Sequence, residues 1–376
     1  MDQLRYLELC EQHLTSLPDY VRKFYINRQA NAYSSATLYQ YLQEYVRFFS
    51  WLIDEQIVMV AEPRLIPLTA LEKMKLEDIE LYKIYLMNKR KANHHKLSFQ
   101  AVNRSINALN ALWYFLTIEA EQADGEPYFY RNVMKKVKLL KSSETMATRS
   151  RHIGQKLLTG DKKHAFIDFM QMTYPKQLSN RQLASYQQNC ERDVAICVLA
   201  LTTGIRLSEL AQANLADLKL EQLTVTVIRK GGQQDTVPIA PWGQPYLEEY
   251  VQIRQTRYAT TANEHALFVA KYRGQAKRMS NYAIEKLVAK YSEAFGVRLT
   301  PHKFRHTLAT DLMAATHSET IVATQLGQTT TQATHLYTHV VDDEQRAAMD
   351  KMEWLKSITW HECWFRYTEN VLKIKY

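Results

Sequence analysis

Three side chains near the C-terminal end combine the chemistry of a proton donor, a phosphate ligand and a nucleophile. His302 and Arg305 are three residues apart, and Tyr337 follows in the same stretch of the chain. Because Arg is almost never fully buried without a partner, we do not expect this set to be core packing. A guanidinium binds a phosphate through paired hydrogen bonds, an imidazole transfers protons, and a phenol can form a covalent intermediate. The stretch therefore predicts chemistry on a phosphodiester.

The histidines in this stretch also have a spacing that occurs in zinc sites. His302 and His306 are four residues apart, but two cations and no Glu lie between them. Positive charge would repel a metal ion, and the motif of zinc peptidases requires that Glu. His335 and His339 flank Tyr337, again with no nearby carboxylate or thiolate to complete a site. We therefore expect no metal.

Composition narrows the class of protein. The chain has 376 residues, 46% of them hydrophobic, and 48 basic against 39 acidic residues give a net charge of +9. This length predicts two domains, or three, with substantial cores, and the positive charge predicts attraction to polyanions, nucleic acid before a membrane surface. No apolar run approaches the roughly 20 residues of a membrane span, and the N-terminus lacks a signal-peptide pattern. Four cysteines without CxxC spacing indicate a reducing, cytoplasmic environment.

The first 125 residues predict helices joined by short loops. Ser34 or Ser35 can cap a helix whose apolar residues recur with helical period up to Leu52. After two prolines, a second helix is expected from Thr69, with its apolar stripe ending at Leu86. Ser98 is the expected cap of a third helix, ending near Leu116.

Basic residues in this half could contact DNA. On the third helix, Arg104 lies between Asn103 and Asn107, opposite the apolar stripe, and Arg and Asn contact both phosphates and bases. Residues 126–160 are a predicted basic linker, in which Lys135 and Lys136 are candidates for contacts with the DNA backbone. The alternative in both places is an ordinary solvated surface.

The C-terminal half places two further cations at defined positions. An apolar helix is predicted to end at Thr203 and Gly204, and Ser208 and Glu209 open a new helix, so Arg206 lies at the junction between them. Arg206 could simply bind a helix-end carbonyl or Glu209, or Glu209 could orient its guanidinium for binding. Residues 223–239 alternate as a β-hairpin around a Gly-Gly turn, with Lys230 at the end of the first strand. A lysine there can reach into a cleft or remain solvated.

Four sequence blocks together resemble the tyrosine recombinase (phage-integrase) family. They are TGIRLSEL, RKGG, TPHKFRHTLAT and LGQTTTQATHLYTHV, in the family's order, and residues 1–351 resemble its Xer-type members. The resemblance implies a mainly α fold with a small β-sheet. It also implies a two-domain clamp: a SAM-like helical core-binding domain (1–125) and, after the linker, a mixed α+β catalytic domain (161–351). A tail (352–376) follows, with an apolar heptad stripe that could contact a neighbouring protomer or have no defined role.

The same resemblance implies a role for each candidate residue. Tyr337 would attack the scissile phosphate to give a 3′-phosphotyrosyl link, while Arg206 and Arg305 bind the non-bridging oxygens. Lys230 would protonate the leaving 5′-oxygen, and His302 would assist proton transfer at the tyrosine. Supporting roles fall to Glu209 and His306. No cofactor is implied, because the covalent link retains the energy of the phosphodiester.

One site residue departs from the family pattern. Gln328 stands where the family usually has His or Trp; an amide still donates a hydrogen bond to a phosphate, although it carries no proton charge. The implied partners are double-stranded DNA at a dif-like site, further copies of the chain in a synaptic tetramer, and an FtsK translocase, with chromosome-dimer resolution as the process. The alternatives are an integrase of a mobile element and a DNA-binding homologue that has lost catalysis.

Overall fold

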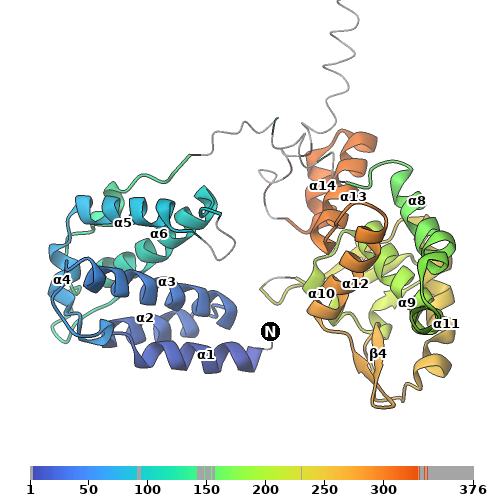
Figure 1. Cartoon of the computed structure of the whole chain (residues 1–376), viewed down its shortest axis with the longest axis horizontal. Helices are drawn as coiled ribbons and strands as arrows, with labels where there is room; N and C mark the ends of the chain where they lie inside the picture. The colour runs from blue at the N-terminus through green and yellow to red at the C-terminus, as the bar shows by residue number, and fades with distance from the viewer. Residues whose placement is uncertain are drawn as a thin grey trace, which may run out of the picture. The chain divides into compact units, whose positions relative to one another are not determined.

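The computed structural model describes residues 3–90, 95–141, 148, 154, 157–229, 231–328, 330, 334 and 337. It divides into two compact units, Met1–Ser143 and Glu144–Tyr376 (Figure 1). The described residues form mostly helices, with two small antiparallel sheets in the second unit. The predicted fold class, mainly α with a small β component, is confirmed. No helix in the described part of the chain is long and apolar enough to cross a membrane.

The N-terminal unit is helical, as its sequence period predicts. Its helices are α1 (Gln3–Thr15), α2 (Asp19–Ala30), α3 (Ser35–Asp54), α4 (Leu68–Lys73), α5 (Leu76–Asn88) and α6 (Phe99–Tyr114), with short helical turns at Pro63–Leu65, Phe115–Glu119 and Val133–Lys136. Both predicted serine caps are present. The Ser34 hydroxyl accepts the Thr37 N–H at the start of α3, and the Ser98 hydroxyl accepts the Ala101 N–H at the start of α6.

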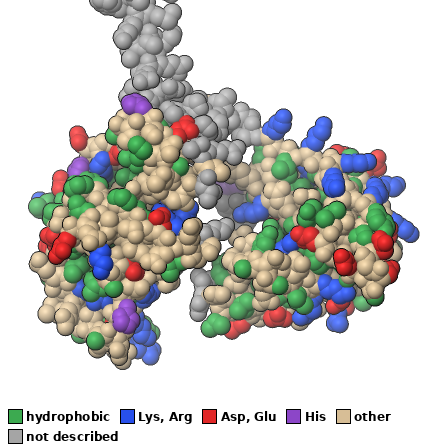
Figure 2. All heavy atoms as spheres, turned by 180° about the vertical axis from the view of Figure 1, so that it is seen from behind, with side chains coloured by type: hydrophobic (Ala, Val, Ile, Leu, Met, Phe, Trp, Pro, Cys, Tyr) green, Lys and Arg blue, Asp and Glu red, His purple; other side chains and the backbone are tan. Residues whose placement is uncertain are grey.

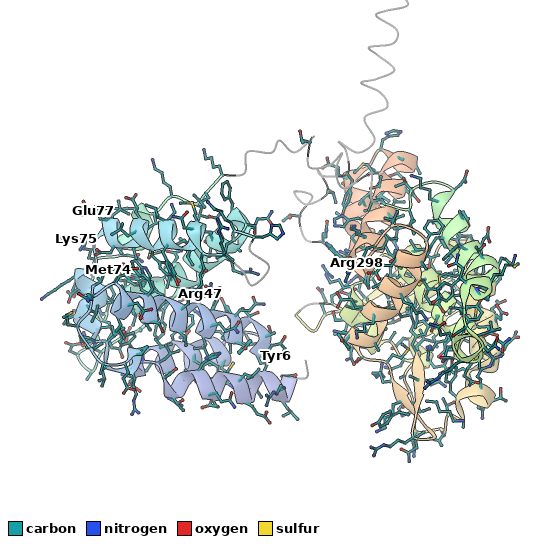
Figure 3. All side chains as sticks on the ribbon, in the orientation of Figure 1. Tyr6, Arg47, Met74, Lys75, Glu77 and Arg298 are labelled. Atoms are coloured by element: carbon teal, nitrogen blue, oxygen red, sulfur yellow. The ribbon has the colours of Figure 1, made fainter. Side chains whose placement is uncertain are left out.

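The second predicted helix is two helices. The helix is interrupted at Met74 and Lys75, labelled in Figure 3, which separate α4 from α5. Asp78 accepts the backbone N–H of Lys75 at 2.7 Å, and this contact caps α5. The prediction of one continuous helix was wrong because Leu71, Met74 and Ile79 stay on the buried side across the break, so their spacing carried no sign of it.

The core of this unit reaches beyond α6. Large side chains such as Tyr45, Phe48 and Trp113 fill its centre. Phe129 and Met134, from the segment expected to begin the linker, are also buried there. Residues 126–141 therefore pack on the N-terminal unit.

The second unit is built around α9 (Asn180–Thr203), which is buried on all sides from Arg192 to its end. A helix of this kind belongs at the centre of a domain. The helices α8 (Lys162–Asp168), α11 (Gln244–Tyr258), α12 (Asn281–Ala294) and α13 (Pro301–Thr316) pack against it. The described part of this unit also contains the helices α10 (Leu207–Gln212) and α14 (Glu319–Leu326), with short turns at Phe169–Thr173, Tyr174–Gln177, Leu215–Asp217 and Pro241–Gly243.

The predicted β-hairpin is present in a three-stranded sheet. It consists of β1 (Leu218–Lys219), β2 (Thr224–Ile228) and β3 (Gln234–Pro238), with Val225 opposite Val237. A second antiparallel hairpin consists of β4 (Val269–Tyr272) and β5 (Gln275–Arg278). Figure 1 shows this second hairpin projecting from the helices of its unit.

Candidate active site

Arg206 is fixed by the carboxylate of Glu209. Gly204 ends α9 in the left-handed conformation (φ 66°), which turns the chain so that Arg206 becomes the cap residue of α10. Glu209 accepts the backbone N–H of Arg206 at 2.7 Å with one oxygen, and binds its guanidinium at 2.8 Å with the other. The Glu209 side chain is 2% exposed, whereas Arg206 is 36% exposed. Both interpretations of Arg206 are thus present together: it is a helix-end residue, and Glu209 orients its guanidinium.

Arg305 is a buried cation held by carbonyl groups. It is 4% exposed, and its guanidinium donates to the carbonyl oxygens of Gly204 and Leu326, both at 2.7 Å. No acidic side chain in the described ranges forms a salt bridge with it. Burial, followed by the charge of Arg206, lowers the pKa of Arg305 to about 10, so it is still charged at neutral pH. A buried charge of this kind is stabilised by an anionic ligand.

Two histidines lie on adjacent turns of α13. The ring centroids of His302 and His306 are 4.4 Å apart in an edge-to-face arrangement. Partial desolvation, followed by the charges of Arg305 and Arg206, lowers the pKa of His302 below its ordinary 6.5. His302 is therefore neutral at physiological pH, the form that can accept a proton.

Tyr337 lies against α13 and α14, and its hydroxyl reaches His306. The ring is 3% exposed and packs with Ala309, Met313 and Leu326. Its hydroxyl oxygen is 2.8 Å from Nδ1 of His306. Burial raises the pKa of Tyr337 to about 12, against the opposing effect of Arg305, so the phenol is protonated at neutral pH. His302, the predicted proton-transfer group, packs against His306, and His306 is the residue that contacts the phenol of Tyr337.

Arg229 belongs to this cluster and was missed in the sequence. It is 8% exposed, donates to Glu209 and to Asp235, both at 2.9 Å, and contacts the carbonyl of Gln325 at 3.4 Å. The strand period contained the signal. Val225 and Val227 are buried on one face of β2, and the same alternation carries Arg229 inward.

Gln328 follows the left-handed Gly327 that ends α14. Its backbone N–H donates to the Ala323 carbonyl at 2.9 Å. Its side-chain Oε1 is buried and has no hydrogen-bond partner in the described part of the chain. Lys230, His335, His339 and the tail (352–376) lie outside the described residues.

The predicted DNA-contact residues lie on the surface of the N-terminal unit. Arg104, Lys135 and Lys136 are all exposed. Asn103 is not available in the same way, because its side chain donates to the Leu140 carbonyl at 2.8 Å and accepts the Leu140 N–H at 2.9 Å. Figure 2 shows basic side chains projecting from both units on the face it draws, with acidic ones among them.

The sequence of this chain is similar to that of known proteins. Residues 173–344 match the model of the Phage integrase family. The tyrosine recombinase XerS of Lactococcus lactis subsp. cremoris is 47% identical over 340 residues, which cover 89% of this chain and 96% of that protein. XerS of Streptococcus sanguinis is 45% identical over 350 residues, covering 92% and 98%.

Solved structures share the fold at low sequence identity. The XerH site-specific recombinase bound to its difH substrate matches with a TM-score of 0.56 at 18% identity, covering 85% of this chain and 81% of that one. A lambda integrase dimer bound to a COC′ core site matches with a TM-score of 0.55 at 14% identity, covering 86% and 95%.

Proposed function

Since the chain belongs to the phage integrase family and is a site-specific tyrosine recombinase, we propose that Tyr337 is the nucleophile that cuts and rejoins DNA. Arg206 and Arg305 bind the scissile phosphate, and Glu209 orients Arg206. His302 and His306 accept the proton of the phenol and transfer it. Lys230, whose position rests on the sequence alone, protonates the leaving oxygen.

The observation that carries this proposal is the buried Arg305. Its guanidinium has two carbonyl partners and no salt bridge with a described carboxylate, close enough to Arg206 and Tyr337 for each to shift its pKa. A phosphate bound there supplies the missing negative charge and lies within reach of the phenol. As the pentacoordinate state forms, its extra charge falls on oxygens that the guanidinium groups already face.

The chemical step balances without an added co-reactant. The phenol oxygen forms a bond to phosphorus while the bond from phosphorus to the 5′-oxygen breaks. The phenol proton passes to an imidazole, and the leaving oxygen takes a proton from Lys230. Because the pKa of Tyr337 is raised to about 12, attack at neutral pH needs such a base. Its 3% exposure means that the tyrosine must shift before its hydroxyl can reach DNA.

A nicked suicide substrate tests the assignment. The wild-type chain should form a covalent protein–DNA adduct at the 3′ side of the cut, and Tyr337→Phe should form none while still binding the same duplex. An adduct of unchanged yield in Tyr337→Phe would exclude this nucleophile. Absence of an adduct in the wild type as well would favour a protein that only binds DNA.

A separate series of substitutions tests the role of Gln328. If its amide donates to the phosphate, Gln328→Ala should slow cleavage more than Gln328→His, because the imidazole retains a donor. Equal rates in the wild type and both variants would exclude that role.

We propose the biological setting from the resemblance of the chain to Xer-type recombinases. The target is a dif-like site in double-stranded DNA, the assembly is a synaptic tetramer, FtsK is the activator, and the process is chromosome-dimer resolution in the cytoplasm. The N-terminal unit, through Arg104, Lys135 and Lys136, is the proposed second DNA-binding surface, and the tail beyond residue 352 a protomer contact. Recombination between two dif-like palindromes, but not between the ends of a mobile element, is the expected result; the reverse would identify an integrase.

The proposed tail contact has a separate test. Unchanged synapsis after truncation at residue 352 would exclude it.

A further inference from the structure

Arg229 lies at the point where three elements of the second unit meet. It follows the last residue of β2, and it binds Glu209 in α10, Asp235 in β3 and the carbonyl of Gln325 in α14. It does not touch Arg206 or Tyr337 in any described contact. We propose that Arg229 is a positioning residue for the cleavage reaction, which acts by holding the carboxylate that orients Arg206. This inference rests on the proposed role of Arg206 as a phosphate ligand.

The two oxygens of Glu209 divide their tasks. Oε1 binds the guanidinium of Arg206 at 2.8 Å. Oε2 accepts the backbone N–H of Arg206 at 2.7 Å and Nη1 of Arg229 at 2.9 Å. A carboxylate can rotate about its last torsion, which is broad. Contacts on both oxygens therefore lock the plane of the group, and with it the direction in which Arg206 presents its guanidinium.

Burial makes the contribution of Arg229 stronger. The Glu209 side chain is 2% exposed and that of Arg229 is 7% exposed, whereas Arg206 is 36% exposed and partly solvated. Without Arg229, the buried carboxylate would depend on one mobile cation for charge compensation. Arg206 would then be drawn toward Glu209 and away from a bound phosphate.

Because Gly327 has no side chain, its position leaves room for the guanidinium of Arg229. A Cβ atom added at Gly327 would lie 2.4 Å from Nε and 2.6 Å from Cζ of Arg229, closer than atoms can approach. The backbone there is also left-handed (φ 58°), which favours glycine. Arg229 thus stacks against the chain immediately before Gln328, and it links the β-hairpin to the end of α14.

The test is a double-mutant cycle on the rate of covalent adduct formation with a nicked substrate at saturating protein. Arg229→Met should slow cleavage roughly 10- to 100-fold while DNA affinity stays within about twofold, since misplacing a catalytic group by about 1 Å has an effect of this size. In the Arg206→Ala background the same substitution should add less than about threefold, because Arg229 acts through Arg206. Arg229→Lys should restore part of the rate, as it keeps one charged contact to Glu209.

Arg192→Met is the matched control. Arg192 is a buried cation of the same unit, paired with Asp193 at 2.6 Å and bonded to the Val269 carbonyl. It should lower the melting temperature as Arg229→Met does, yet leave the cleavage rate of the folded protein unchanged. If Arg229→Met does not fold, Arg229→Lys and Gly327→Ala enter the cycle instead.

The outcomes separate this proposal from the one on which it rests. Full additivity of the Arg229 and Arg206 effects, or a rate unchanged by Arg229→Met, would overturn the positioning role while the wild-type adduct and its loss in Tyr337→Phe still stand. No wild-type adduct at all would instead count against the proposed function. Non-additivity with partial rescue by Lys supports the proposal.

Discussion

Among the described residues, each unit buries one glutamate in a polar cluster, and the two clusters differ in charge. In the N-terminal unit Glu44 binds Arg47, labelled in Figure 3, at 2.6 Å and accepts the hydroxyl of Ser105. In the second unit Glu209 binds two guanidinium groups, those of Arg206 and Arg229. One carboxylate faces one cation in the first case and two in the second.

The difference indicates what each cluster is for. The Glu44 cluster is neutral and its hydrogen bonds are internal, so it can join α3 to α6 without any ligand. Around Glu209, Asp235 compensates Arg229, but Arg305 adds a further buried charge, whose partners among the described residues are carbonyl groups. Surplus buried charge costs free energy in the unliganded protein. A fold tolerates that cost where an anion binds, and this supports our proposal that phosphate chemistry takes place at the second cluster.

The largest effect is expected from removing the surplus cation. Arg305→Ala should slow adduct formation by about 100- to 1,000-fold, because it deletes a preorganised donor to the charge that develops on the phosphate. The control is Arg47→Ala, which removes the cation of the balanced cluster. Arg47→Ala should lower the free energy of unfolding by about 1 kcal/mol and leave the cleavage rate of DNA-bound protein unchanged. A comparable loss of cleavage in both variants would remove the distinction between the clusters.

Neutralising each glutamate in turn gives the next effect. Glu209→Gln leaves Arg206 without a counter-charge and Arg229 with Asp235 alone. We therefore expect about 2–4 kcal/mol of lost stability together with a cleavage rate roughly 10- to 100-fold lower. Glu44→Gln should lower the free energy of unfolding by about 1–3 kcal/mol and leave the cleavage rate unchanged. Chemical denaturation and single-turnover cleavage measure the two quantities on the same preparations. Cleavage at the wild-type rate in Glu209→Gln would exclude the orienting role of Glu209.

The features that sequence could predict are local ones. Ser34 and Ser98 cap their helices as predicted, because a cap depends on residues within one turn. The break at Lys75 was missed, since the buried period continues across it. Arg229 was not predicted, although the alternation after Val225 and Val227 places its side chain on the buried face, because the RKGG motif carries the expected chemistry on its neighbour Lys230.

Contacts between distant elements lay beyond the sequence. His302, Arg305 and Tyr337 were predicted from residue types and spacing, and the structure brings them into one cluster. The contact between Tyr337 and His306 depends on how Tyr337 packs against α13, and no sequence spacing encodes that. The contacts of Asn103 were equally unpredictable: its side-chain amide forms hydrogen bonds with the backbone of Leu140.

The pH dependence should differ between the units. The pKa values of His302 in the second unit and of His13 in α1 are both lowered from 6.5. The unfolded chain therefore binds more protons than the folded one, and both residues reduce stability as the pH falls below 6.5. Of these two histidines, we expect only His302 to affect the cleavage reaction. Cleavage should be constant from pH 8 to 6.5 and decline at lower pH by up to about tenfold per unit.

His13→Gln provides the control for this profile. It should weaken the acid-induced loss of stability and leave the pH profile of cleavage as in the wild type, whereas His302→Gln should lower the plateau and flatten the acid limb. A wild-type rate that rises through pH 7 to 9 would contradict a neutral histidine base. It would indicate that ionisation of the phenol, with its raised pKa, limits the reaction.

The smallest effect concerns the surface of the N-terminal unit. Arg104 is exposed on α6 beside Asn103, and the two residues are expected to act differently. If Arg104 contacts a phosphate, Arg104→Ala should weaken DNA binding a few-fold and reduce the slope of log affinity against log salt concentration by about 1. Asn103→Ala should instead cost about 1 kcal/mol of stability, through its lost bonds to Leu140, and leave the salt slope unchanged. Fluorescence anisotropy over a salt series measures the slopes. Equal slopes for Arg104→Ala and the wild type would show that Arg104 is a solvated surface residue, and would leave DNA contacts in this unit to Lys135 and Lys136.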